Sequence, residues 1–241
     1  MEVFDNVKGY AYDQPINDSL EKKAIQTLEI IYENGKSKFE NILIAGCGKG
    51  EEASVFYKLT KANVTGVDLN AIPIIKTEDG RRFQIKIESL DDLSFTDEEF
   101  DLIYCYHVLE HVNDPEKVLL ELKRVLSKDG IIFIGFPNRL RMLPGYLSTH
   151  LNISLIEVIK FNLNDYKMRF TGKFKNKYGA HAGFSEKEFL KMAKPIFSNT
   201  LSVRKIWIDK NYTKFGFLFK IINKLMLADF FYPSNYYIIK K

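Results

Sequence analysis

The chain has 241 residues, of which 46% are apolar and 27% are charged, a balance that excludes an intrinsically disordered protein. Its two cysteines, Cys47 and Cys105, are too few for a disulfide scaffold or a zinc site made of cysteines. The sequence shows neither a signal peptide nor an apolar stretch of roughly 18–20 residues that could span a bilayer, so we expect a cytoplasmic protein.

The net charge of +4 conceals two parts of opposite sign. Residues 1–138 carry 16 basic and 25 acidic side chains, and residues 139–241 carry 19 basic and 6 acidic ones. The first part therefore has a charge of −9 and the second a charge of +13. Such an asymmetry indicates either different tasks for the two parts or a surface that meets something anionic.

The first part of the chain alternates between predicted strands and helices. Apolar residues at helical spacing predict a helix that starts near Asn17 and ends near Gly35. Strands are then expected over 41–45, 64–67, 83–87, 100–105 and 131–136, and helices over 51–59, 71–79 and 115–126. This alternation is typical of βαβ units and predicts an α/β fold, a Rossmann-like, mostly parallel sheet of seven strands flanked by helices.

The regular alternation stops at Pro137, and a long basic insert follows. A helix is expected within it near 151–163, and Ser185–Glu188 has the pattern of a capping box that opens a further helix. Strands are expected again over 201–208 and 236–239. We expect one domain over 1–241, composed of a ligand-binding core (36–138), the insert (139–184) and a C-terminal part that completes the sheet (185–241).

The most informative segment is Ile42–Gly50, where a predicted strand leads into glycine-rich turns and then a helix. Glycines let the chain turn tightly and let a ligand approach the backbone at the carboxyl edge of the sheet. Asp68 ends the next strand, where an acidic side chain accepts hydrogen bonds from ribose hydroxyls. Glu51 occupies the place of the third glycine of a dinucleotide-binding loop, and its carboxylate would repel a pyrophosphate. The loop therefore favours a nucleoside ligand without phosphate, such as S-adenosylmethionine, over a glycine turn that binds nothing.

Several segments in order along the chain share this pattern with one known family. They are Ile42–Gly50, Val64–Asp68, Ser89–Phe95, Phe100–Val112 and Leu122–Phe133. Over residues 36–138 the sequence resembles the class I S-adenosylmethionine-dependent methyltransferases, and within them the group known as methyltransferase type 11. The resemblance implies S-adenosylmethionine as the cofactor, with its contacts made by Gly46, Cys47, Gly48, Gly50, Asp68, Leu69, Ser89, Leu90, Cys105 and Tyr106.

Within this set the resemblance assigns particular roles. The glycines would surround the methionine end, Asp68 would hold the ribose, Leu90 would contact the adenine, and Cys105 and Tyr106 would lie beside the methionine moiety. Ser89 departs from the family, which usually has an aspartate there for the adenine amino group, and a hydroxyl accepts such a hydrogen bond more weakly. Cys105 is expected as a small buried apolar residue rather than a nucleophile.

His107, Glu110 and His111 are spaced so that a helix would place all three on one face. They have three interpretations: ordinary packing, a general base in His107, or a set of ligands for a divalent metal. Quinone-biosynthesis O-methyltransferases resemble this segment and use an acid-rich version of it for a metal. Because His107 stands where an acid would be and magnesium prefers oxygen ligands, no metal is predicted, and these three residues are the weak candidate set.

The basic part contains further candidates for contact with a substrate. His181 precedes a Phe-Ser segment, as a histidine often does in methyltransferases with such an insert, and is a second candidate base beside the alternative of an ordinary loop histidine. Arg139 and Arg141 follow the fifth predicted strand and suit an anionic group of a substrate. A basic stretch over 167–177 fits an anionic glycan, a lipid or a membrane surface as well as a solvated loop. Nucleic acid ranks last because no recognised RNA-binding module is present.

The aromatic segment Phe215–Phe231 fits the core or a dimer face, and alternatively a peripheral contact with the inner face of an anionic membrane. Together the patterns predict an enzyme that transfers a methyl group from S-adenosylmethionine to a small-molecule, sugar, glycan or lipid acceptor, with O-methylation expected. A quinone or other lipid methyltransferase and a non-catalytic nucleoside-binding module of the same fold are the alternatives. The sequence fixes neither the acceptor atom nor the oligomeric state.

Overall fold

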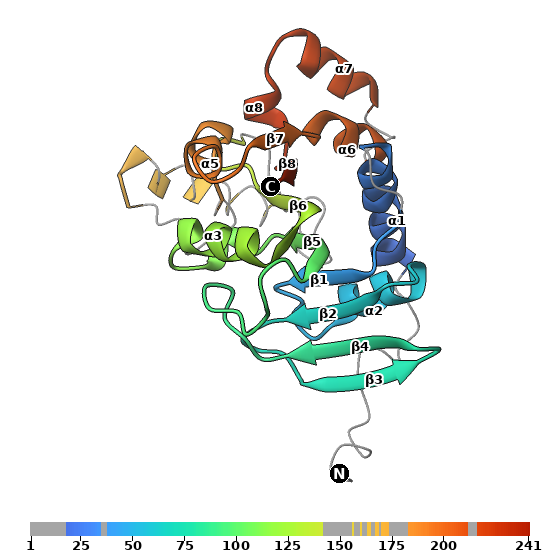
Figure 1. The fold of residues 1–241 in the computed structure, drawn as a ribbon. Coiled ribbons are helices and arrows are strands. Elements are labelled where there is room, and N and C mark those ends of the chain that lie inside the picture. Colours follow the sequence, from blue (N-terminus) through green and yellow to red (C-terminus); the bar gives the residue numbers. More distant parts are fainter. Residues whose placement is uncertain are drawn as a thin grey trace.

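The computed structural model describes residues 18–34, 38–141, 183–211 and 216–241, together with positions 156, 160, 163, 164, 167, 168 and 170–173. Among these residues an eight-stranded sheet forms the centre of the molecule, in the order β3-β4-β2-β1-β5-β6-β8-β7 (Figure 1). The strands are β1 Asn41–Ala45, β2 Asn63–Val67, β3 Ile74–Glu78, β4 Arg81–Lys86, β5 Phe100–Tyr106, β6 Leu126–Pro137, β7 Asn199–Ser202 and β8 Ser234–Lys240. The helices are α1 Asp18–Glu33, α2 Glu51–Leu59, α3 Pro115–Val125, α5 Glu186–Ala193, α6 Arg204–Asn211, α7 Gly216–Lys224 and α8 Ala228–Phe231, and a 3-10 turn η1 covers Leu109–His111.

The sheet confirms the predicted α/β fold. Strands β4, β2, β1, β5 and β6 run parallel, whereas β3, β8 and β7 pair antiparallel with their neighbours. The central strands are buried and apolar because helices cover both faces, as parallel sheets require. One apolar layer packs α1, α2, α6 and α7 against the sheet, and a second packs η1, α3 and α5 against the opposite face.

One element differs from the prediction: residues 71–79 contain a strand, not a short helix. Ile74–Glu78 pairs antiparallel with β4, and Asp79 and Gly80 between the two strands have φ of 51° and 74°. Two consecutive residues of positive φ make the tight hairpin turn that Asp-Gly favours. The Asp-Gly dipeptide and the β-branched Ile, Ile and Thr before it were the signals for a hairpin, and they add an eighth strand.

The predicted strand over 201–208 is also wrong for most of its length. Strand β7 ends at Ser202, and α6 begins at Arg204. Val203, Trp207 and Ile208 are all buried, and their spacing of four and five residues puts them on one helical face rather than in strand alternation. The helix predicted near 151–163 lies for the most part outside the described residues.

Two predicted helix starts are confirmed by their caps. Asp114 accepts a hydrogen bond from the Lys117 backbone N–H at 3.0 Å and opens α3. Ser185 and Glu188 form the predicted capping box of α5, in which each side chain accepts from the other residue's backbone N–H. These caps fix the N-terminal ends of α3 and α5, the two α-helices that form the second apolar layer with the sheet.

Candidate functional site

A cavity of about 440 Å³ opens at the carboxyl ends of the parallel strands. This is the edge at which open α/β sheets bind ligands. The loops after β1, β2, β4 and β5 converge there with the start of α3. The residues that line the cavity are Gly46, Asp68, Leu69, Asn70, Glu88, Ser89, Leu90, Asp91, His107, Val108, His111, Val112, Asn113, Asp114 and Val118. Seven predicted site residues therefore come together in one cavity: Gly46, Asp68, Leu69, Ser89, Leu90, His107 and His111.

The glycine loop after β1 needs its glycines for two different reasons. Gly46, Gly48 and Gly50 have φ of 73°, 54° and 93°, a region that other residues rarely adopt. A Cβ on Gly46 would lie 2.2 Å from Cγ2 of Val108, so this position also needs the missing side chain for packing. A Cβ on Gly48 would meet no atom within 4 Å. The backbone of Gly48 therefore faces open space in which a ligand can approach it.

Asp68 ties this loop to the end of β2. Its Oδ2 accepts a hydrogen bond from the Gly48 backbone N–H at 3.0 Å, and its Oδ1 accepts from the Asn70 N–H at 2.8 Å. Each carboxylate oxygen has a second lone pair left for a ligand hydroxyl. The side chain is thus held in place by backbone donors and still presents two acceptors to the cavity.

The loop after β4 supplies an acid that the sequence analysis missed. The Ser89 hydroxyl donates a hydrogen bond to Oδ1 of Asp91, and this bond lowers the pKa of Asp91. Both side chains line the cavity, where the family usually has an aspartate at the position of Ser89. Asp91 thus places a carboxylate in the cavity two residues after Ser89, and the short Ser-x-Asp spacing was the available signal.

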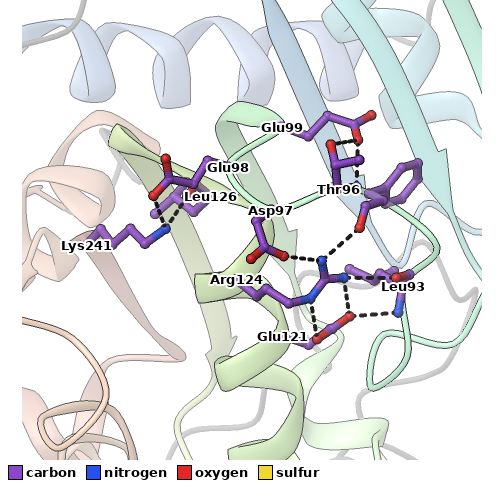
Figure 2. Close-up of polar contacts among 10 residues, drawn as sticks. Leu93, Thr96, Asp97, Glu98, Glu99, Glu121, Arg124, Leu126 and Lys241 are labelled. Carbon is purple, nitrogen blue, oxygen red and sulfur yellow. Dashed lines mark hydrogen bonds and ion pairs between the residues drawn. The ribbon is translucent and has the colours of Figure 1, made fainter.

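A polar network centred on Arg124 of α3 holds this loop in place (Figure 2). The guanidinium donates to the carbonyl oxygens of Leu93 and Phe95 at 2.9 and 2.8 Å, and to both oxygens of Glu121 at 2.6 and 3.0 Å. A further bond of 2.8 Å reaches Asp97, and the Leu93 N–H donates to Glu121. The two carboxylates raise the pKa of Arg124 above its already high value. The segment that carries Ser89 and Asp91 is therefore fixed to a rigid helix.

The cavity is acidic. Asp68, Glu88, Asp91 and Asp114 line it, and none of the described residues that line it is a lysine or arginine. Carboxylates attract a cation and repel phosphates at short range. The lining therefore suits a nucleoside ligand that carries a positive charge and no phosphate, as the sulfonium of S-adenosylmethionine does.

His107 lies at the end of β5 in a strained backbone conformation. Its φ of 56° is unusual for a residue with a Cβ, and such outliers concentrate at functional sites. Its Nδ1 lies 3.6 Å from Oε1 of Glu110, and its Nε2 lies 3.4 Å from Oγ of Ser234. Burial, Lys23 and Arg141 lower the pKa of His107 to about 3, so the imidazole is neutral near pH 7.

Glu110 is the buried partner of both histidines. Its side chain is 1% exposed, and its Oε1 also lies 3.9 Å from Nε2 of His111. Its Oε2 has no hydrogen-bond partner among the described residues. Burial raises the pKa of Glu110 to about 7, so this carboxyl changes its charge near neutrality, directly behind a residue of the cavity wall.

The raised pKa of Glu110 gives a testable dependence of stability on pH. Between its ordinary pKa of 4.5 and about 7, the folded state holds a proton that the unfolded state has released. The free energy of unfolding must fall with rising pH across this window, by up to about 3 kcal/mol for this group. Glu110→Gln lacks this term, so its stability should increase relative to the wild type from pH 4.5 to 7. Urea unfolding over a pH series measures the difference, with exposed Glu116→Gln as control; a pH-independent difference would contradict the assignment.

The three residues weighed as metal ligands are not arranged as a metal site. Among the described residues no group of three or more His, Cys, Asp or Glu side chains is placed to hold an ion. The two histidines lie on either side of a single oxygen of Glu110, at 3.6 and 3.9 Å. The three residues do not share one helix either, because the 3-10 helix η1 covers Leu109–His111 and His107 precedes it.

Cys47, Cys105 and Tyr106 lie behind the cavity lining rather than in it. Both thiols are buried, Cys105 completely, and burial raises the pKa of each to about 12. This agrees with Cys105 as a small packed residue instead of a nucleophile. Tyr106 is half-buried, with the Nζ of Lys23 4.1 Å from the centre of its ring. Gly50 is the N-cap residue of α2, and the Gly48 backbone N–H donates to Asp68.

The two arginines expected to contact a substrate have partners within the protein. Arg139 forms an ion pair with Glu188, the capping-box residue of α5. Arg141 is 5% exposed and donates to the carbonyl oxygens of Asn138 and Pro233, both at 3.3 Å. Neither lines the cavity. His181, the second candidate base, lies outside the described residues.

No helix in the described part of the chain is both long and apolar enough to cross a membrane.

Comparison with known proteins points to one family. Residues 43–134 match the sequence profile described as a methyltransferase domain. A ubiquinone biosynthesis O-methyltransferase of Actinobacillus pleuropneumoniae is 30% identical over 123 residues, which are 46% of this chain and 52% of that protein. An uncharacterized protein of Methanocaldococcus jannaschii is 34% identical over 144 residues, 58% of this chain and 63% of that one. The chain thus spans between half and two thirds of the length of these relatives.

Solved structures share the fold at low sequence identity. The plantazolicin methyltransferase BamL, in complex with a desmethyl analogue and S-adenosylhomocysteine, has a TM-score of 0.60 and 13% identity, covering 95% of this chain and 88% of its own. A phosphoethanolamine N-methyltransferase of Haemonchus contortus, solved with S-adenosylhomocysteine, has a TM-score of 0.53 and 16% identity, covering 90% of this chain and 52% of its own.

Proposed function

Because this chain belongs to the class I S-adenosylmethionine-dependent methyltransferases, with its methyltransferase domain at residues 43–134, we propose that it transfers the methyl group to a hydroxyl of a small-molecule acceptor. S-adenosylmethionine supplies an electrophilic methyl on a sulfonium. The protein must hold that group, align an acceptor oxygen with it and take up the hydroxyl proton.

The observation that carries the proposal is the composition of the cavity wall. Gly46 and Asp68 lie beside Ser89 and Asp91, and His107 lines the same cavity. We assign the ribose hydroxyls to Asp68, whose two oxygens are already oriented by backbone N–H groups. Asp91, ordered by Ser89, is the acceptor that suits the adenine amino group. The open space beside Gly48 fits the methionine end.

The base in this proposal is the pair formed by His107 and Glu110. An imidazole with a pKa of about 3 is by itself a weak base at neutral pH. When Glu110 ionises near pH 7, its charge at 3.6 Å favours the protonated imidazole. His107 can then accept the hydroxyl proton as the methyl moves, while Glu110 stabilises the imidazolium and positions the ring.

Cofactor binding is tested first, because it needs no acceptor. Asp68→Ala should weaken S-adenosylmethionine binding by about 10- to 100-fold, since hydrogen bonds to a charged group contribute about 1.5–3 kcal/mol. Isothermal titration calorimetry measures the dissociation constant for wild type and variant, and Asp209→Ala, an exposed acid of α6 that pairs with Lys205 and does not line the cavity, serves as control. Absence of wild-type binding at millimolar cofactor would overturn the proposed function; an unchanged affinity in Asp68→Ala would overturn the ribose assignment alone.

The acceptor is tested with tritiated methyl groups. The protein and labelled S-adenosylmethionine are incubated with pooled phenols, sugars, glycans, quinone precursors and lipids, and the label is followed into product. A product that resists mild alkali and acid is expected, because an ether survives where an ester hydrolyses. Label recovered only on nitrogen or carbon would contradict O-methylation while leaving methyl transfer in place.

A further inference from the structure

Helix α7, the turn after it and the short helix α8 expose a group of large apolar side chains, here called the α7 patch. The patch comprises Phe217, Leu218, Ile221, Leu225, Met226 and Phe230, which are 79%, 45%, 40%, 59%, 89% and 44% exposed. Figure 1 shows α7 at the end of the molecule farthest from β3 and β4. Contiguous apolar surface of this kind marks an interaction site more often than chance exposure.

The arrangement of side chains around α7 is that of a helix lying at an interface. Phe217, Ile221 and Leu225 recur at intervals of four and form one exposed stripe. Phe219 and Ile222 turn inward, where the Phe219 ring packs against Tyr232 at 5.3 Å. The core therefore uses one part of the apolar surface of α7 and leaves the stripe 40–79% exposed.

Charge at the edge of the stripe indicates what covers it. Lys220 and Lys224 recur at the same interval and flank the stripe, with exposed side chains. The nearby acid, Asp229, forms an ion pair with Arg204, with 2.8 Å between Oδ1 and Nη1. The patch also belongs to the part of the chain with a charge of +13. A two-fold contact with a second copy would bring the same patches and their lysines together, which disfavours that occupant. Apolar residues beside lysines suit a bilayer with anionic headgroups.

We propose that the α7 patch docks this protein on the surface of an anionic lipid bilayer. The apolar stripe inserts at the level of the headgroups, and Lys220 and Lys224 contact the lipid phosphates. The docked segment leads directly to the site: α8 follows α7, and Ser234 at the start of β8 lies 3.4 Å from His107. Bilayer binding adds a partner to the proposed methyl transfer and does not require catalysis.

Flotation with lipid vesicles tests the docking. The wild type should float with phosphatidylcholine vesicles that contain about one third phosphatidylglycerol, and only weakly with phosphatidylcholine alone. The double variant Phe217→Ser/Met226→Ser should lose about 10-fold or more in partitioning, since both side chains are highly exposed. Lys220→Gln/Lys224→Gln should lose on the order of 10-fold on the anionic vesicles alone. The control is Ile75→Ser, an apolar side chain 71% exposed on β3.

Circular dichroism and S-adenosylmethionine titration confirm that each variant is folded, and they separate loss of docking from loss of the proposed function. Failure of the wild type to float, or equal flotation of the Phe217→Ser/Met226→Ser and Ile75→Ser variants, would overturn the docking. Equal flotation on both vesicle types would also overturn it as a contact with anionic lipid. A wild-type dimer that the Phe217→Ser/Met226→Ser variant dissociates, with no vesicle binding, would assign the patch to a second copy instead.

Discussion

His107→Gln is expected to lower kcat for methyl transfer by about 100- to 10,000-fold, the range that a positioned general base contributes. Glutamine keeps a similar length and polarity but cannot take up the hydroxyl proton. The dissociation constant for S-adenosylmethionine should change little, because Asp68 and the glycine loop make the contacts assigned to the cofactor. Steady-state rates with the acceptor found by labelling, together with calorimetric titration of the cofactor, separate the two effects.

The pH profile distinguishes a base from a residue that only fills space. Wild-type kcat should rise through pH 7 as Glu110 ionises, and Glu110→Gln should lose this rise. The deficit of His107→Gln should shrink at high pH, where the acceptor hydroxyl ionises on its own. His111→Gln is the matched control, because His111 is 65% exposed and lies 3.9 Å from the same oxygen. A His107→Gln variant with normal kcat at every pH would show that the acceptor needs no base here.

Local patterns predicted the parts of the site that depend on neighbours in sequence. The glycine turn and Asp68 belong to a strand-turn-helix and a strand end, so their place at the sheet edge follows once the strands are parallel. Ser89 and Leu90 follow the end of β4, so the same argument predicts that they lie at this edge of the sheet. The carboxylate of Asp91 was not predicted, because the resemblance indicates an acid at position 89, where this chain has a serine, and the acid that lines the cavity comes two residues later.

Contacts between distant segments could not be predicted. Arg139 was expected to contact a substrate, and the structure adds an ion pair with Glu188, 49 positions later in the sequence, which no local pattern indicates. Arg141 lies against carbonyls that include Pro233 from the chain end. Glu110 was treated as part of a triad, and only its burial shows why its pKa rises. In the fold, the Asp79-Gly80 hairpin was predictable from its turn residues, whereas the strand-to-helix change at Val203 depends on burial of Trp207.

Gly46→Ala is expected to destabilise the protein by about 3 kcal/mol, from a left-handed backbone that costs about 1–2 kcal/mol and an overpacked contact that costs about 1–3. The new Cβ would lie 2.2 and 2.6 Å from the two γ carbons of Val108, which itself lines the cavity. Relief of this clash must move Val108, and with it His107 beside it. Cofactor affinity should therefore fall together with stability.

The chain provides both a control and a rescue for this change. Gly48→Ala has a similar φ of 54° but meets no atom within 4 Å, so it should cost about 1 kcal/mol by strain alone. In Gly46→Ala/Val108→Ala the two γ carbons are gone and only the Val108 Cβ position at 3.0 Å remains. The double variant should recover about 1–2 kcal/mol relative to the sum of the single changes, as urea unfolding can show. Equal costs for Gly46→Ala and Gly48→Ala, or strict additivity with Val108→Ala, would mean that Gly46 is required for its backbone conformation and not for the approach of the loop after β5.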